Sequence, residues 1–459
     1  MKMMEVSNRE QKLPASYEEA VGWINSLIPF GIRPGLDRIL MMMEAFGNPH
    51  ENLKFIHVAG TNGKGSSCAF LTQTLMECGY TVGTFTSPYI TKFTNRFQYN
   101  LEDIAEETLL TVTTQMMPVV KQIADSELGS PTMFEVSTAI ALVYFASYCK
   151  PDVVVWETGL GGRMDVTNIV TPLASLITNI GLDHTDVLGD TISLIATEKA
   201  GIIKEGIPVV SCVTQPEAIA VLKETAKAKH APLYLWREQF TYKREPLNEL
   251  RQRLHFIGPS HDHLIEIGLQ GEHQCTNAAG VLMVLDILRE QLGYVLSDNA
   301  IKTGMRDTTW AGRMELIHTN PRIVLDGAHN PEGASSLAHS IPETYQYKKL
   351  NLMMGILANK HHQAYLQHIL PIVDTLIISE PDFRRKLDAE DLFKIVNELK
   401  AQYAKAELKI IVEPDWKKAL SLLLAQTQQD DLGVVTGTLY MISDVRASLL
   451  HQTDSEKGW

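Results

Sequence analysis

The stretch HVAGTNGKGSS at residues 57–67 combines the residue types that bind a phosphate group. Gly60, Gly63 and Gly65 allow backbone N–H groups to turn inward around an anion. Lys64 adds a positive charge, and the residues after it read as a helix whose N-terminus would face the same anion. This chemistry predicts a nucleotide-phosphate site, with ATP as the nucleotide.

The sequence of this loop differs from the common P-loop motif, G-x-x-x-x-G-K-[ST]. Val58 stands where the first glycine is expected, and Gly65 separates Lys64 from the hydroxyl group of Ser66. The alternative is a glycine-rich turn that only joins a strand to a helix. The order of strand, glycines, lysine and helix favours the phosphate site.

Two further apolar runs end in groups that could handle a metal ion. Glu157 ends VVVWE, where it could hold Mg²⁺ or could be a buried carboxylate capped by the glycine turn after it. Asp183, His184 and Asp186 follow the run ASLITNI. Because Mg²⁺ prefers oxygen ligands, the residue types alone favour His184 as an ordinary loop residue.

Two later segments carry reactive side chains. Lys199 lies in TEKAGIIKEG, where composition favours a surface lysine. In VLDGAHNPEG, Asp326 ends a strand and is followed by His329 and a helix start at Asn330. Such a turn could hold a ribose through the aspartate and a phosphate through the histidine.

The elements that must position these groups are short apolar runs alternating with helix-like segments, which is typical of α/β folds with parallel sheets. Ligands of such sheets bind at the C-terminal ends of the strands, where the polar turns fall. We expect an N-terminal domain at residues 1–300 and a C-terminal domain at 301–459, joined by a linker near 297–312. The segments 241–256 and 258–271 alternate in polarity and predict an antiparallel insertion.

Composition limits the class of protein. The chain has 459 residues, 45% of them hydrophobic, and a formal net charge of −13. That charge argues against nucleic acid or an acidic membrane as a partner. Five scattered cysteines predict free thiols in a reducing compartment, and neither a signal peptide nor an apolar run of about 18 residues is present. We expect a cytoplasmic protein.

Several motifs occur together and in one order: HVAGTNGKGS, FTSPY, ETGLGGRMDVTNIV, GLDHTDVLGD, EKAGIIK, WAGRMEL and DGAHNPEG. As a set they resemble folylpolyglutamate synthase/dihydrofolate synthase, a family of the Mur ligase superfamily, over residues from about 30 to 445. The resemblance makes the unusual loop the family's own variant. It implies a P-loop-containing N-terminal ATPase domain with a mainly parallel sheet and a smaller Rossmann-like α/β C-terminal domain.

The resemblance also implies a reaction. ATP, with Mg²⁺, phosphorylates a carboxylate of a folate or of dihydropteroate, and the amino group of L-glutamate attacks the acyl phosphate. Tetrahydrofolate polyglutamylation is implied, together with the dihydrofolate synthase reaction. We expect a monomer.

Site residues carry over position by position. The ATP phosphates would be held by Gly60, Thr61, Asn62, Gly63, Lys64, Gly65 and Ser66. The matching metal ligands are Ser87, Glu157 and His184, and the matching nucleotide contacts are Asn277, Arg313 and Asp326. His329 matches a residue near the γ-phosphate, and Lys199 matches a lysine that carries a carbamate. Thr132 and Asp165, with residues 34–39, match the pterin side.

The sequence differs from the family pattern in two places, and two other classes of protein are alternatives. Asn95 precedes Arg96 where the family commonly has an acid, and Asn359 and His361 stand where acids often flank the lysine. A peptidoglycan Mur ligase would place a uridine-nucleotide domain before the loop, but only 56 residues precede His57. A non-catalytic nucleotide-binding regulator would not need Ser87, Glu157, His184 and Lys199 together.

Overall fold

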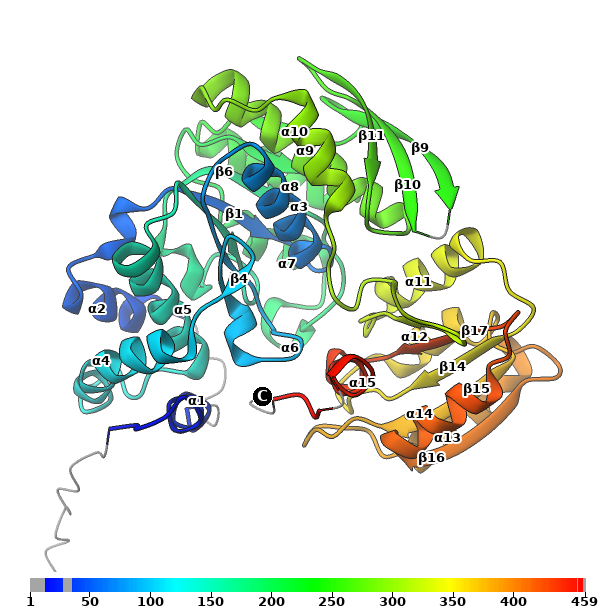
Figure 1. Ribbon diagram of the computed structural model, residues 1–459. Coiled ribbons are helices and arrows are strands. Elements are labelled where there is room, and N and C mark those ends of the chain that lie inside the picture. The colour runs from blue at the N-terminus through cyan, green and yellow to red at the C-terminus, as the bar shows by residue number, and fades with distance from the viewer. Residues whose placement is uncertain (1–12, 28–34, 249, 452, 457–459) are drawn as a thin grey trace, which may run out of the picture.

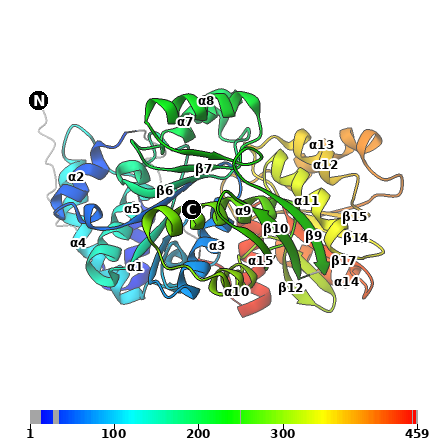
Figure 2. The same cartoon turned by 90° about the horizontal axis from the view of Figure 1, so that it is seen from above.

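The computed structural model describes residues 13–27, 35–248, 250–451 and 453–456. Three sheets organise them: one of eight strands, one of three and one of six. The eight- and three-stranded sheets and their helices form one body, and the six-stranded sheet forms a second body beside it (Figures 1 and 2).

The eight-stranded sheet has the order β4-β3-β2-β5-β1-β6-β7-β8. From β2 to β8 all pairs are parallel, and β3 and β4 add an antiparallel edge. The central strands are buried throughout, as expected for a parallel sheet covered on both faces. The strands are β1 (Phe55–Ala59), β2 (Val82–Phe85), β3 (Phe97–Tyr99), β4 (Glu102–Asp103), β5 (Val153–Glu157), β6 (Pro172–Ile177), β7 (Val209–Ser211) and β8 (Leu233–Leu235).

Helices cover both faces of this sheet. Alternate residues of β5 enter two different cores, one beneath α3 and α9 and one beneath α1, α2, α4 and α5. The helices are α1 (Tyr17–Asn25), α2 (Asp37–Ala45), α3 (Lys64–Glu77), α4 (Glu106–Ala124), α5 (Met133–Tyr144), α6 (Thr185–Leu188), α7 (Ile192–Ala200), α8 (Pro216–Ala228), α9 (Glu272–Leu292) and α10 (Asp298–Asp307).

The three-stranded sheet is antiparallel, which confirms the predicted insertion. Its buried residues alternate along β10 and face the core that α3 and α9 share. The strands are β9 (Thr241–Asn248), β10 (Arg251–Ile257) and β11 (Asp262–Ile267).

The segment expected to be a linker at 297–312 contains a helix. Ser297 caps α10 by accepting a hydrogen bond from Ala300 N at 3.2 Å, and Ile301 and Met305 bury one face of it. The helix packs closely on α3, since a methyl group at Gly304 would lie 2.4 Å from Thr74 Cα. Only residues 308–314 therefore connect α10 to the second body.

The six-stranded sheet has the order β12-β13-β17-β14-β15-β16, and only β12 is antiparallel. Helices α11, α12 and α13 cover one face, and α14 and α15 cover the other. The elements are β12 (Glu315–Thr319), β13 (Arg322–Leu325), α11 (Pro331–Thr344), β14 (Leu350–Met354), α12 (His362–Ile369), β15 (Thr375–Glu380), α13 (Ala389–Tyr403), β16 (Lys409–Asp415), α14 (Trp416–Gln426), β17 (Leu432–Thr436) and α15 (Leu439–His451).

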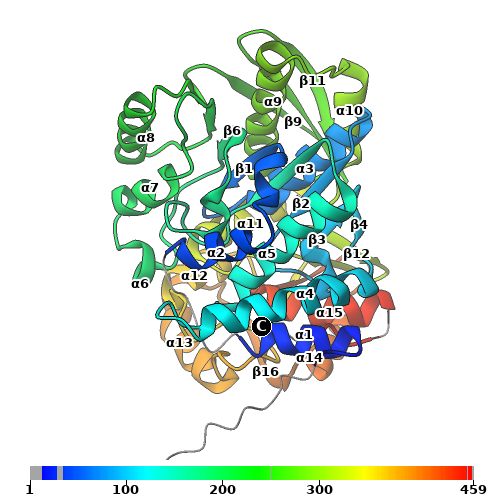
Figure 3. The ribbon, with the colours of Figure 1, turned by 90° about the vertical axis from the view of Figure 1, so that its left-hand side faces the viewer.

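After α15 the segment 453–456 returns to the first body, next to α1 (Figures 1 and 3). The carboxylate of Glu456 accepts hydrogen bonds from Tyr17 Oη at 2.7 Å and from Phe93 N at 2.8 Å. Glu456 N donates to Thr91 O at 2.9 Å. Within the part of the chain that the structure describes, no helix is long and apolar enough to cross a membrane.

Candidate active site

The glycine-rich loop joins β1 to α3 and is closed in by other elements. Gly63 caps α3 with a φ of +84°, a conformation that favours glycine. A methyl group there would lie 2.3 Å from Asn277 Oδ1 on α9, and one at Gly65 would lie 2.9 Å from the Trp310 ring nitrogen. The structure thus brings the predicted residue Asn277 directly against the loop.

Lys64 folds back over this loop. Its Nζ donates to Gly60 O at 3.1 Å and to Thr61 O at 3.4 Å, and it lies 4.0 Å from Glu157 Oε1. Gln274 Nε2 reaches Ser66 Oγ at 3.2 Å. The loop therefore holds its ammonium group at the start of a helix, between backbone carbonyls and a carboxylate.

Glu157 and Ser87 meet at the ends of β5 and β2. Ser87 N donates to Glu157 Oε2 at 3.0 Å, and the glutamate is buried. Burial raises the pKa of Glu157, and the nearby charge of Lys64 opposes that rise. A buried carboxylate that contacts the backbone of a serine at the end of the neighbouring strand fits an oxygen-preferring cation such as Mg²⁺.

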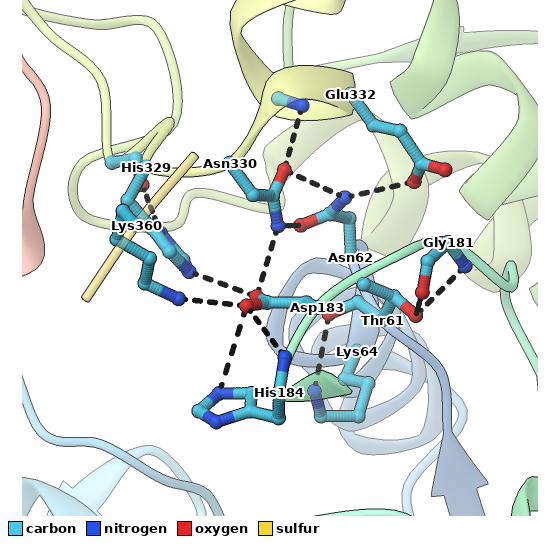
Figure 4. Close-up of polar contacts among 12 residues, drawn as sticks. Thr61, Asn62, Lys64, Gly181, Asp183, His184, His329, Asn330, Glu332 and Lys360 are labelled. Carbon is cyan, nitrogen blue, oxygen red and sulfur yellow. Dashed lines mark hydrogen bonds and ion pairs between the residues drawn. The ribbon is translucent and has the colours of Figure 1, made fainter. Parts of the chain in front are cut away.

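Asp183 is the centre of a contact between the two bodies (Figure 4). Its carboxylate lies 2.7 Å from Lys360 Nζ, 3.2 Å from Asn330 Nδ2 and 3.6 Å from His329 Nε2. Burial would raise the pKa of Asp183, but His329, Lys360 and His184 together hold it well below its ordinary range. The carboxylate is therefore ionised and draws the second body onto the first.

His184 follows Asp183 with a φ of +51°. Its side chain is 44% exposed, but partial desolvation by its surroundings lowers its pKa to about 4, and Asp183 opposes that shift. The imidazole is neutral at pH 7, which is the form that ligates a metal. The backbone N–H of His184 donates a hydrogen bond to Asp183 Oδ1 at 3.0 Å, which holds His184 next to this carboxylate.

A second set of contacts joins the loop to α11. Asn330 Nδ2 donates to Asn62 Oδ1 at 3.0 Å, and Asn62 Nδ2 lies 3.4 Å from Glu332 Oε2 (Figure 4). A methyl group at Gly181 would lie 1.9 Å from that same carboxylate oxygen. Burial raises the pKa of Glu332 to about 7, and Asp183 adds to the rise.

Sequence reasoning did not assign Glu332 or Lys360 to the site. The sequence indicated Glu332 only as part of the helix start after His329. It indicated the segment around Lys360 only as a difference from the family pattern. Their partners, Asn62 and Asp183, lie in the other body, so no local pattern pointed to them. Their position after strands β13 and β14 was the available signal.

Asp326 anchors the turn between β13 and α11. Its carboxylate accepts hydrogen bonds from Met314 N at 3.0 Å and Ala328 N at 2.9 Å. Burial raises the pKa of Asp326, and the charge of Arg313 opposes that rise. Arg313 also acts electrostatically on Glu157, so its charge bears on both the Asp326 turn and a candidate metal ligand.

Lys199 is 3% exposed, so the interpretation as a surface lysine is wrong. The polar neighbours of Lys199 point elsewhere on α7, while its own side chain enters the protein. Burial lowers its pKa to about 7, and Lys64 adds to that effect. The charges of Asp183, Asp165 and Glu332 all act on this amine and oppose the shift.

The two residues predicted for the pterin side lie at the start of α5, for Thr132, and in the segment after β5, for Asp165. Thr132 caps α5 in a capping box with Glu135, which pairs with Arg38 at 2.8 Å. Asp165 accepts hydrogen bonds from Leu160 N at 2.6 Å and Thr167 N at 3.0 Å. Neither residue has a hydrogen bond or ion pair with Asp183 among the described contacts, and the Thr132 hydroxyl group and the Asp165 carboxylate both have local structural roles.

A cavity of about 160 Å³ lies next to the Ser87 turn. Both bodies line it, with Thr86, Pro88, Tyr89, Ile90, Thr91, Asn95 and Gln98 from one and Trp310, Ala311 and Arg446 from the connection and the other. The space is thus adjacent to a candidate metal ligand and opens between the two bodies.

A glycine-rich phosphate loop on a parallel sheet, facing a second α/β body across charged contacts, defines a Mur-type ligase. Family models agree: the Mur ligase middle domain matches residues 58–285, and the Mur ligase, glutamate ligase domain matches residues 312–439. The chain is an ATP-dependent, amide-forming ligase.

The relatives specify the family. A dihydrofolate synthase/folylpolyglutamate synthase of Bacillus subtilis is 37% identical over 435 residues, covering 95% of this chain and 99% of the relative. A folylpolyglutamate synthase of Lacticaseibacillus casei is 32% identical, with 95% and 99% covered. The chain belongs to the folylpolyglutamate synthase/dihydrofolate synthase family, as its motifs predicted.

Solved structures agree with this assignment. Folylpolyglutamate synthase of Thermotoga maritima matches with a TM-score of 0.83 and 33% identity, covering 96% of this chain and 98% of that one. The Escherichia coli protein FolC, solved in complex with DHPP and ADP, matches with a TM-score of 0.84 and 26% identity, covering 95% and 98%. The predicted α/β fold class is confirmed.

Proposed function

We propose that this protein joins L-glutamate to the carboxylate of a folate-type acceptor at the expense of ATP. Both tetrahydrofolate polyglutamylation and the conversion of dihydropteroate to dihydrofolate are included. The observation that carries the proposal is the family membership, which extends over 95% of the chain. The charged cluster between the two bodies supports it, because the reaction must bring together three anionic substrates.

The chemistry proceeds in two steps. An acceptor carboxylate oxygen attacks the γ-phosphorus of ATP, the bond to ADP breaks, and an acyl phosphate forms. The amino nitrogen of L-glutamate then attacks the acyl carbon, inorganic phosphate leaves, and the nitrogen loses a proton. Gly60 to Ser66 would hold the phosphates, with Lys64 neutralising their charge.

Asn277 of the first body, Arg313 of the connection and residues of the second body would complete the nucleotide site. We assign Asn277, Arg313 and Asp326 to nucleotide contacts and His329 to the γ-phosphate. The distance of 3.6 Å between His329 Nε2 and Asp183 Oδ2 supports a position at the junction of the two bodies. Thr132 and Asp165 remain assigned to the pterin side.

Ser87, Glu157 and His184 would hold Mg²⁺, which when bound neutralises charge that develops on the transferred phosphoryl group. The buried Glu157 carboxylate and the neutral His184 imidazole support this assignment. The cavity beside Ser87 offers room for a substrate group next to the metal.

We further propose that Lys199 carries a carbamate. Its neutral amine would add CO₂ and lose one proton, which converts a cation into an anion that can face Mg²⁺. The pKa of about 7 supports this step, since only the neutral amine is nucleophilic.

The division into domains at 1–300 and 301–459 also remains a proposal, as does action as a monomer in the cytoplasm. Contacts such as Asn62 with Asn330 support a complete site within one chain.

One assay tests the function. Purified protein receives ATP and Mg²⁺ with or without L-glutamate, and with dihydropteroate or tetrahydrofolate in parallel reactions. ADP release should require both L-glutamate and a folate-type acceptor. Release that depends on UDP-linked sugar peptides, or release without either acceptor, would contradict the proposal.

The phosphate loop has its own test. Lys64→Ala should lower ATP turnover by roughly 100-fold or more, because the phosphate charge loses its neutralising ammonium group. Circular dichroism should show an unchanged fold. Near-normal turnover in the folded variant would refute the placement of ATP on this loop.

A further inference from the structure

A cluster of possible metal ligands lies outside the ATP site, at the outer end of the three-stranded sheet (Figure 1). His261 lies in the turn between β10 and β11, His263 on β11 and Asp286 on α9. One ligand atom from each side chain lies within 4.8 Å of the other two. The β10–β11 hairpin and helix α9 thus converge on one point.

Asp286 Oδ1 has ion-pair contacts with His261 and Arg289, but other polar atoms of this cluster are buried without a hydrogen-bond partner among the described residues. His263 is 5% exposed and Asp286 is 4% exposed. Among the described residues, His263 Nε2 and Asp286 Oδ2 have no hydrogen-bond partner. His261 Nδ1 lies 3.1 Å from Asp286 Oδ1 but without hydrogen-bond geometry. Buried polar atoms left in this state are costly unless something else binds them.

The charges around the cluster are compatible with a cation. Arg289 Nη2 lies 3.5 Å from Asp286 Oδ1, but Arg289 Nη1 binds Asp298 at 2.8 Å. Glu290 Oε1 lies 3.6 Å from His261 Nε2. Three carboxylates therefore surround one guanidinium group, which leaves net negative charge for a metal ion.

The local backbone also lies close to the cluster. A methyl group at Gly258 would lie 3.0 Å from Asp286 Oδ2, so glycine lets the turn approach this carboxylate. The rings of His261 and His263 are nearly parallel, with centroids 5.5 Å apart.

We propose that His261, His263 and Asp286 form a binding site for a first-row transition metal ion, with Zn²⁺ as the preferred occupant. Two imidazoles and one carboxylate are a common zinc donor set, and water would fill the fourth position. Mg²⁺ fits less well, because it takes mainly oxygen ligands and two of the three ligands here are imidazoles. The competing explanation is a simple His261–Asp286 ion pair.

The site is separate from the ATP site. Asn277 and Asp286 lie nine residues apart on α9, or about 14 Å along a helix. A bound ion would fasten the β10–β11 hairpin to the helix whose first turns contact the phosphate loop. Its role is thus to stabilise the hairpin on α9.

Zinc titration of the full-length protein tests the site. The protein is stripped with a chelator and titrated with Zn²⁺ in a Glu157→Gln background, which excludes binding at the candidate magnesium site. His263→Ala and Asp286→Asn should each weaken the tightest binding at least tenfold. His255→Ala, which removes another histidine of the same hairpin, should leave it unchanged.

Two further readouts distinguish binding from a folding defect. Co²⁺ should give the visible absorption of a tetrahedral site in the parent protein and lose it in His263→Ala, and Zn²⁺ should raise the melting temperature of the parent alone. If His263→Ala fails to fold, His261→Ala replaces it, because that side chain is partly exposed. Equal zinc affinity in parent and variant, or no thermal shift in either, would overturn the proposal.

Discussion

At the scale of single residues, Lys199 combines burial with a lowered pKa. An ordinary lysine has a pKa near 10.5 and is almost fully protonated at neutral pH, whereas burial lowers that of Lys199 to about 7. A large fraction of this amine is therefore neutral under physiological conditions. The buried amine is suited to covalent modification, and the proposed carbamate would use that property.

Replacing Lys199 tests the carbamate. Lys199→Ala should lower turnover by roughly 100-fold or more while ATP binding persists, because the anion that faces the metal is lost. Formate or acetate at high concentration should restore part of the turnover. Lys199→Arg should be inactive and resist rescue, since its fixed charge repels Mg²⁺. Retention of most activity in Lys199→Ala would refute the assignment.

His57 lies on β1, the strand before the phosphate loop, and contacts the turn that follows Asp165. The ring is fully buried, its Nε2 lies 3.0 Å from Thr167 Oγ1, and burial lowers its pKa to about 3. In the unfolded chain its pKa is near 6.5. Below pH 6.5 only the unfolded state gains a proton here, so stability is present above that pH and is lost as pH falls.

The expected effect is large enough to measure. Between pH 6.5 and pH 5 this one histidine should cost about 2 kcal/mol of folding free energy, at about 1.4 kcal/mol per pH unit. His57→Gln should remove that portion of the acid sensitivity, whatever the substitution costs at pH 7. Urea unfolding at pH 7 and pH 5 compares the two proteins. The same pH dependence in both would contradict a neutral buried His57.

How far the site could be predicted depended on where the partners lie. Lys64 was found because it lies in the glycine-rich loop, and Glu157 and Asp183 were found because they lie at or just after the end of an apolar run. Lys199 was misjudged on residue type because its neighbours are polar, and only the resemblance pointed to its role. Glu332 and Lys360 were missed because their contacts cross between the bodies, which sequence spacing does not reveal.

At the scale of elements, the apolar runs predicted the strands and their polar ends, and alternation predicted the antiparallel insertion. Helix α10 was missed, because its few apolar residues resemble a loop until α3 supplies the surface that buries them. Ser297 was the available signal, since it is a typical N-cap. Helices held by packing are harder to predict than helices held by their own sequence.

Two glycines test the packing of α10. Gly304→Ala should destabilise the protein by about 1–3 kcal/mol, because the new methyl group meets the α3 backbone. Gly22→Ala in α1 is the matched control, since no atom lies within 4 Å of its added methyl group, and it should gain up to about 1 kcal/mol. Thermal and urea unfolding measure both. Stabilisation by Gly304→Ala would show that α10 does not pack as described.

At the scale of the whole molecule, the Asp183–Lys360 pair ties the two bodies together. Both side chains are about nine-tenths buried, so removing one leaves an unpaired buried charge. Lys360→Ala should open the ligand-free protein and enlarge its radius of gyration in small-angle scattering. An ATP analogue with a folate acceptor should restore a compact form, because substrates bridge the same cleft.

A matched control is Lys348→Ala, which removes an exposed pair with Asp430 within the second body. That variant should scatter like the parent with and without ligands. An unchanged radius in ligand-free Lys360→Ala would show that this pair does not hold the bodies together.

The hydrogen bond from Tyr17 to Glu456 spans 439 positions of the chain. During synthesis on a ribosome, α1 is made early, but its partner emerges only after all the intervening residues. At about 5–20 residues per second, that interval is roughly 20–90 seconds. For that time the first helix lacks its final contact, and the nascent protein exposes surface that a chaperone could bind. Slow translation of the second half would lengthen this exposure, so codon usage there bears on the yield of folded protein.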